Sequence, residues 1–195
     1  MKNRLGLLLT LASCAPSVSS DEQARRAYLG LDRAISKSLT LGLAGFNSAS
    51  SANIAPQSTA GDKSGSLTVT GQVDQGASAN KGLRLKVGMV NYSDGDVTPD
   101  GGPRLAVTYQ TADAGADQPA LGLSLRSIPN GTLTGTLLGD FAMSGDLNGA
   151  VKLDLSMSGM IEADGNGGTR REVGSTTVAG SATSGAGTFQ VNLSL

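Results

Sequence analysis

The feature that most constrains the fold is a change in the spacing of apolar side chains, which is helical before about residue 50 and alternates in several segments after residue 65. The alternating positions hold Leu83, Leu85, Val87 and Met89, then Leu105, Val107 and Tyr109, then Leu121, Leu123 and Leu125, then Val151, Leu153, Leu155 and Met157, and finally Phe189, Val191, Leu193 and Leu195. Strands of this kind have one apolar and one polar face, which is typical of antiparallel sheets. The turn signal Asn130-Gly131 separates two of these segments. We predict about eight antiparallel strands within residues 65–195.

The helical spacing lies in residues 21–51. Its apolar stripe comprises Tyr28, Leu31, Ile35, Leu39, Leu43 and Phe46. Ser20 and Gln23 fit a capping box at its start, and Pro56 prevents much further helix. We predict one helix over residues 21–51, bent near Gly42 and Gly45, with a break there as the alternative. Residues 52–64 are predicted to be a linker.

The width of the predicted sheet limits how helix and sheet can pack. Eight strands about 4.8 Å apart span more than about 30 Å, whereas a helix with its side chains is about 10–12 Å across. One helix cannot cover a flat apolar face of that width. The predicted fold is therefore α+β and mainly β: a single domain over residues 21–195, with the long N-terminal helix packed on a curled antiparallel sheet or barrel. A folded-over sandwich, or an apolar face left open for a partner, are the alternatives.

The first 14 residues combine Lys2 and Arg4, an apolar run over residues 5–12, and a cysteine that follows small residues. This order is typical of a signal peptide. The four residues "LASC", which end at Cys14, resemble the lipobox of bacterial lipoproteins. The resemblance implies a signal peptide over residues 1–13, cleavage between Ser13 and Cys14, lipidation of Cys14, and a lipidated tether over residues 14–20. A buried cysteine in a short N-terminal helix is the alternative.

The same resemblance implies where the chain is located. Its partner would be the membrane, reached through lipidated Cys14, and its location the bacterial cell envelope. In Gram-negative lipoproteins, Asp after the cysteine favours retention in the inner membrane. This chain has Ala15 there, which resembles the route to the outer membrane.

The composition excludes several classes of function. The chain has no histidine and one cysteine, which excludes histidine-based zinc sites, His-dependent catalytic triads and an intramolecular disulfide. The net charge is −1, and it becomes more negative when Lys2 and Arg4 leave with the signal peptide. Nucleic acid is bound by clustered basic residues, so we predict no nucleic-acid partner. We also expect no cofactor and no catalytic activity.

Residues 93–102 bring together Asp94, Asp96 and Asp100. Carboxylates are ligands for Ca²⁺, but Pro99 and Leu105 stand where an EF-hand loop starting at Asp94 requires Gly and Glu. We predict a solvated hairpin loop, with a calcium site as the alternative.

The mismatch between a wide apolar face and one narrow helix favours a non-catalytic binding module for an apolar ligand, such as a lipid, or for another envelope component. Its ligand lining is predicted at Leu85, Val107, Leu123 and Leu153, because the low aromatic content leaves aliphatic side chains to line any cavity. A scaffold lipoprotein that binds a protein partner is the alternative. A remote alternative is a carboxylate-dependent hydrolase that uses Glu162 and Glu172. The basic pair Arg25 and Arg26 either contacts anionic headgroups or is solvated surface.

Overall fold

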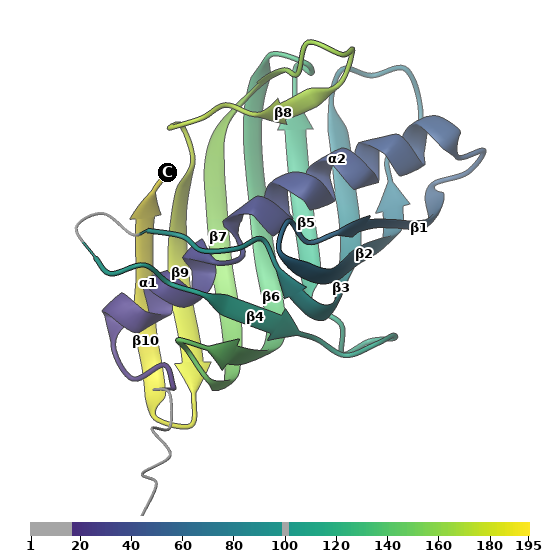
Figure 1. Cartoon of the computed structure of the whole chain (residues 1–195). Helices are drawn as coiled ribbons and strands as arrows, with labels where there is room; N and C mark the ends of the chain where they lie inside the picture. Colours follow the sequence, from purple (N-terminus) through teal and green to yellow (C-terminus); the bar gives the residue numbers. More distant parts are fainter. Residues whose placement is uncertain (1–16, 99–101) are drawn as a thin grey trace, which may run out of the picture.

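The computed structural model describes residues 17–98 and 102–195, which form two helices and one antiparallel sheet of ten strands (Figure 1). The helices are α1 (Asp21–Leu29) and α2 (Asp32–Ser48). The strands are β1 (Asn53–Ala60), β2 (Ser64–Val73), β3 (Lys81–Ser93), β4 (Val107–Gln110), β5 (Ala120–Arg126), β6 (Gly131–Gly145), β7 (Gly149–Ala163), β8 (Thr169–Arg171), β9 (Thr177–Ser184) and β10 (Gly187–Ser194). The fold class predicted from the sequence is confirmed in its coarse form, α+β and mainly β.

The sheet runs in the order β1-β2-β3-β4-β6-β7-β9-β10. Strand β5 lies beside β4 in the same gap between β3 and β6, because it pairs with both of these long strands. Strand β8 pairs with the end of β7 beyond β9. The sheet is strongly curled, and the two helices cross its concave face, with α1 beside β10 and α2 running toward β1 (Figure 1). The curled sheet is open, with β1 and β10 as its two edges.

The alternating pattern of the sequence places one side of each strand in the core. The predicted inward residues of β3, β5 and the first part of β7 are each at most 4% exposed. They pack against the helical stripe, of which Tyr28, Leu31, Ile35 and Leu39 are also at most 3% exposed. The helix therefore uses its apolar stripe to cover the concave face of the sheet, as predicted.

The helical segment predicted over residues 21–51 is present as a bent segment that ends at Ser48, and it is divided into α1 and α2 at Gly30 and Leu31. Tyr109 of β4 causes the division. Its hydroxyl donates a hydrogen bond of 2.8 Å to the carbonyl of Ala27, which would accept from Leu31 N–H in a continuous helix. Leu31 N–H bonds the carbonyl of Tyr28 instead. An added Cβ on Gly30 would lie 2.1 Å from the Tyr109 oxygen, so only glycine permits this approach.

Gly42 and Gly45, where the bend or break was predicted, both lie within α2, and the segment is divided at Gly30. They serve close packing instead. A Cβ on Gly42 would lie 2.8 Å from Leu83 of β3, and one on Gly45 would lie 3.0 Å from Ile54 of β1. The two glycines allow α2 to lie directly on the strands below it.

Residues 53–60 form strand β1, so the prediction of a linker over residues 52–64 is wrong. The segment lacks a clear alternating pattern, because only Ile54 is buried. Pro56 is tolerated because β1 is an edge strand and its pairing with β2 shifts register between Ile54 and Gln57.

Candidate functional site

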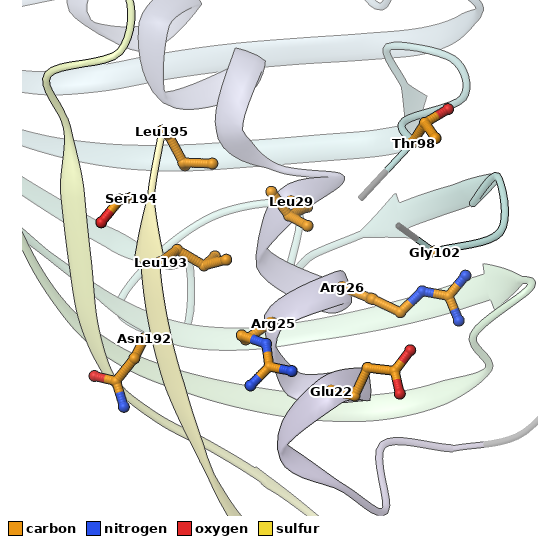
Figure 2. A pocket seen from close by; sticks show the side chains of 10 residues that line it. All are labelled: Glu22, Arg25, Arg26, Leu29, Thr98, Gly102, Asn192, Leu193, Ser194 and Leu195. Carbon is orange, nitrogen blue, oxygen red and sulfur yellow. The ribbon is translucent and has the colours of Figure 1, made fainter. Parts of the chain in front are cut away.

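A groove of about 560 Å³ lies between α1 and the end of β10 (Figure 2). We call it the α1–β10 groove. Its lining consists of Glu22, Arg25, Arg26, Leu29, Thr98, Gly102, Asn192, Leu193, Ser194 and Leu195. Its size falls within the range of about 300–1,000 Å³ that is usual for ligand pockets.

The position of α1 in this groove is set by its N-terminal cap and by contacts to β9 and β10. Ser20 accepts a hydrogen bond from the backbone N–H of Gln23, which confirms the predicted N-cap. The side chain of Asp21 accepts a hydrogen bond of 2.8 Å from the backbone N–H of Gln190 in β10. Val18, just before the helix, is fully buried and its carbonyl accepts from Ser184. These contacts hold the first turn of α1 against the edge of the sheet.

The floor of the groove is apolar. Leu193 and Leu195 point toward Leu29 of α1, whereas Asn192 and Ser194 point away (Figure 2). The three leucines are only half-buried, unlike Val191 one step earlier in β10, which is fully buried. The apolar surface of the concave face therefore continues past the core and is accessible at this end.

The wall of the groove is basic. Arg25 and Arg26 come from α1, together with the single acid Glu22. Arg26 donates from Nη2 to the carbonyl of Pro103 at 3.1 Å, and its buried Nε has no hydrogen-bond partner among the described residues. The side chains of the lining thus include two cations and one anion, and neither Arg25 nor Glu22 forms an ion pair within residues 17–98 and 102–195.

The backbone of β10 also faces this groove. Leu195 and Thr176 exchange both of their backbone hydrogen bonds, so by the alternation of antiparallel pairing the odd-numbered residues of β10 bond to β9. The N–H and C=O groups of Thr188, Gln190, Asn192 and Ser194 point away from β9. Asp21 satisfies the N–H of Gln190, whereas no backbone partner is found for Asn192 or Ser194 in the part of the chain that the structure describes.

The residues predicted from the sequence to line an apolar cavity lie elsewhere. Leu85, Val107, Leu123 and Leu153 are all at most 4% exposed within the core. A small void between α2 and the sheet lies near them, but it is too small for a water-sized sphere. These four side chains are packed in the core and none of them lines the α1–β10 groove, although Leu123 also borders an open hollow of about 370 Å³ over β3, β5 and β6. Ser13 and Cys14, the predicted cleavage and lipidation residues, lie outside the described residues.

In the predicted acidic loop, Asp94 is not solvated as expected. The side chain of Asp94 is only 2% exposed. It accepts hydrogen bonds from Lys37 Nζ at 2.5 Å, from the Tyr92 hydroxyl at 2.5 Å and from the backbone N–H of Asp62 at 3.1 Å. Asp96 is paired with Lys63 and Arg104, and Asp100 lies outside the described residues. The described carboxylates of this loop are therefore balanced by cations, and no group of three metal-ligating side chains occurs in residues 17–98 or 102–195.

The pKa values of this cluster reflect its ion pairs. The hydrogen bond from Lys37 lowers the pKa of Asp62. Partial burial acts to lower the pKa of Lys37, but its hydrogen bonds to Asp62 and Asp94 outweigh that effect and raise it. The cluster joins α2, the β1–β2 turn and the end of β3 through these contacts.

Of the two glutamates considered for catalysis, Glu162 forms an ion pair with Arg170 at 2.9 Å. The side chain of Arg171 is only 9% exposed and is paired with Asp32 at 2.7 Å. It also donates to Ser36. Arg171 thus fixes β8 to α2.

The sequence analysis identified Arg25 and Arg26 but did not connect them with Leu193 and Leu195. The alternating pattern of residues 189–195 predicted the strand, although nothing in it predicted that α1 would lie beside that strand. No protein-family model, no curated protein and no solved structure matches the chain. None of the helices in the described ranges is long and apolar enough to cross a membrane.

Proposed function

We propose that the chain is a lipid-anchored, non-catalytic binding protein of the bacterial cell envelope, held at the outer membrane through Cys14, and that its binding surface is the α1–β10 groove. The anchor is supported by the sequence "LASC" after a basic and apolar leader. Glu22 of the groove follows Cys14 by eight residues, so even a fully extended tether keeps the groove within roughly 30 Å of the anchor.

The observation that carries this proposal is the contrast between a filled interior and an open groove. The core around Leu85, Val107, Leu123 and Leu153 has no space for a ligand, whereas the groove combines three half-buried leucines with two arginines. A partner would therefore bind at the surface, at one edge of the sheet. This favours another envelope component over a small molecule enclosed within the fold.

An anionic lipid is the second candidate, and the groove lining favours it over other small ligands. Leu29, Leu193 and Leu195 suit an acyl chain, and Arg25 suits a phosphate or carboxylate. Native mass spectrometry before and after solvent extraction detects this alternative as a lipid bound at a fixed stoichiometry.

The anchor is tested by feeding cells an alkyne-tagged fatty acid and comparing the wild-type chain with Cys14→Ser. We expect label and membrane association for the wild type only. Equal labelling of both chains, or of neither, contradicts the anchor.

The binding surface is tested by placing a photo-reactive amino acid at position 25 in the groove. The matched control is position 126, because Arg126 is an exposed arginine at the end of β5. We expect adducts of defined mass at position 25 only, and their mass separates a protein partner from a lipid. Similar adducts at both positions would show that the groove is not a specific surface.

A further inference from the structure

We infer that β10 accepts an additional strand: an extended peptide segment of the partner, with apolar side chains at alternate positions and an acidic residue beside them, pairs with β10 at Asn192 and Ser194. This inference rests on the proposed function of the α1–β10 groove and names the class of partner that the groove binds.

The backbone groups of β10 provide the first argument. The N–H and C=O groups of Asn192 and Ser194 point away from β9, and no partner for them is found in the described residues. The neighbouring outward N–H, that of Gln190, donates to Asp21. This bond makes the edge unavailable for strand pairing at Gln190. The free part of the edge thus coincides with the groove. A guest strand there would satisfy both donors and acceptors, as in β-strand addition.

The side chains of the groove match an extended chain. Leu193 and Leu195 lie two residues apart on the concave side of β10, and Leu29 faces them from α1 (Figure 2). A strand paired with β10 would turn every second side chain to the same side. Its apolar residues would then contact these leucines and complete the burial that ends at Val191.

Charge selects the composition of the guest. Arg25 has no ion pair among the described residues, whereas Arg26 donates to the carbonyl of Pro103. An Asp or Glu side chain of the guest would supply an acceptor for the Arg25 guanidinium, by charge-assisted hydrogen bonds.

Other occupants fit this set of groups less well. A lipid phosphate accepts hydrogen bonds but does not donate them, so it would leave the outward carbonyls of Asn192 and Ser194 without donors. A second copy of the chain that paired through its own β10 would bring the same basic patch to both sides of the contact, as two-fold symmetry requires. A peptide with an acidic residue satisfies the backbone of β10 and Arg25 together.

The inference is tested by panning a display library of random octapeptides against the full-length lipidated chain in mild detergent. Enriched peptides are synthesised, and their binding is measured by fluorescence anisotropy. Asn192→Pro removes one outward N–H from the groove without removing a bond to β9. Thr188→Pro is the matched control, because it removes an outward N–H of the same strand outside the groove. Circular dichroism verifies that both variants are folded.

We expect enrichment of peptides that alternate apolar residues and contain Asp or Glu. Asn192→Pro should weaken their binding about tenfold, which corresponds to about 1.4 kcal/mol, whereas Thr188→Pro should change it less than twofold. Arg25→Glu should shift the preference from acidic to basic peptides, and the exposed control Arg126→Glu should not.

Three results would overturn the inference. One is that no alternating peptide is enriched, or that those enriched bind Asn192→Pro as well as the wild type. A second is that only vesicles containing phosphatidylglycerol bind, in a manner that depends on Arg25, which assigns the groove to a headgroup. The third is a wild-type dimer, detected by light scattering, that Asn192→Pro dissociates, which assigns the edge to a second copy. None of these results bears on Cys14, so the anchor succeeds or fails separately in the labelling experiment.

Discussion

Asp94→Asn is expected to destabilise the protein by about 2–4 kcal/mol. Asp94 is 2% exposed and accepts hydrogen bonds from Lys37, Tyr92 and the backbone of Asp62. Removing one partner of a buried ion pair costs about 3–5 kcal/mol. The cost is smaller here, because Lys37 is 23% exposed and keeps its 2.7 Å ion pair with Asp62. The asparagine amide group keeps one oxygen, so its NH2 group would replace the acceptor either of Lys37 and the Asp62 N–H or of the Tyr92 hydroxyl.

Urea unfolding followed by circular dichroism measures this loss as a lower midpoint at an unchanged slope. For a domain of this size, it corresponds to a fall in Tm of roughly 5–12 °C. Asp96→Asn is the matched control. Asp96 stands two residues later and pairs with Lys63 and Arg104, which are 56% and 74% exposed. Ion pairs at the surface contribute about 0–1 kcal/mol, so the control should lose no more than that.

The reasoning is refuted if Asp94→Asn and Asp96→Asn lose the same stability. A double-mutant cycle between Lys37→Met and Asp94→Asn gives a second check, because a direct interaction predicts a coupling energy above about 1 kcal/mol. A coupling energy near zero would mean that the contact between these two side chains does not stabilise the fold.

Three other perturbations address the helices and the same cluster. Ser38→Ala should stabilise the protein by roughly 0.5–1 kcal/mol in urea unfolding, because the buried Ser38 hydroxyl has no partner among the described residues. Ser36→Ala should destabilise the protein in the same assay, because it removes an acceptor for Arg171. Tyr109→Phe should cost about 1–2 kcal/mol in thermal unfolding, because it removes the buried bond to the Ala27 carbonyl. At pH values above 3.8, the ordinary pKa of an aspartate, the lowered pKa of Asp62 contributes to stability. This contribution is lost as the pH falls through the folded-state pKa. At pH values below 10.5, the ordinary pKa of a lysine, the raised pKa of Lys37 contributes to stability. This contribution is lost as the pH rises through the folded-state pKa. Both pH effects should be reduced in Asp62→Asn.

The sequence predicted the parts of the fold that depend on local periodicity. The alternation in β3, β5 and β7 identified the inward residues, because a period of two assigns each side chain to one face of a sheet. Strand β1 has only Ile54 buried, so it carries no such pattern and was predicted as linker. Its place in the sheet depends on pairing with β2 rather than on its own side chains.

Features that depend on distant contacts could not be predicted in this way. The helix divides at Gly30 because a tyrosine 79 positions later bonds the Ala27 carbonyl. Asp94 is buried because Lys37 of α2 neutralises it, although its neighbours Ser93, Gly95 and Asp96 are typical of a solvated turn. The candidate site has the same origin, since Arg25 and Leu193 are 168 positions apart in the sequence.

The division of the helix links the fold to the proposed site. α2 contacts β1, β2, β3 and β8, whereas α1 contacts β10 at the opposite edge of the sheet. A single straight helix follows one line and cannot match a strongly curled surface from one edge to the other. The bond from Tyr109 allows the chain to change direction at Gly30, so that α1 reaches β10 and Asp21 binds Gln190. The α1–β10 groove is therefore a consequence of this division, and Tyr109→Phe should weaken peptide binding in the groove even where the protein stays folded.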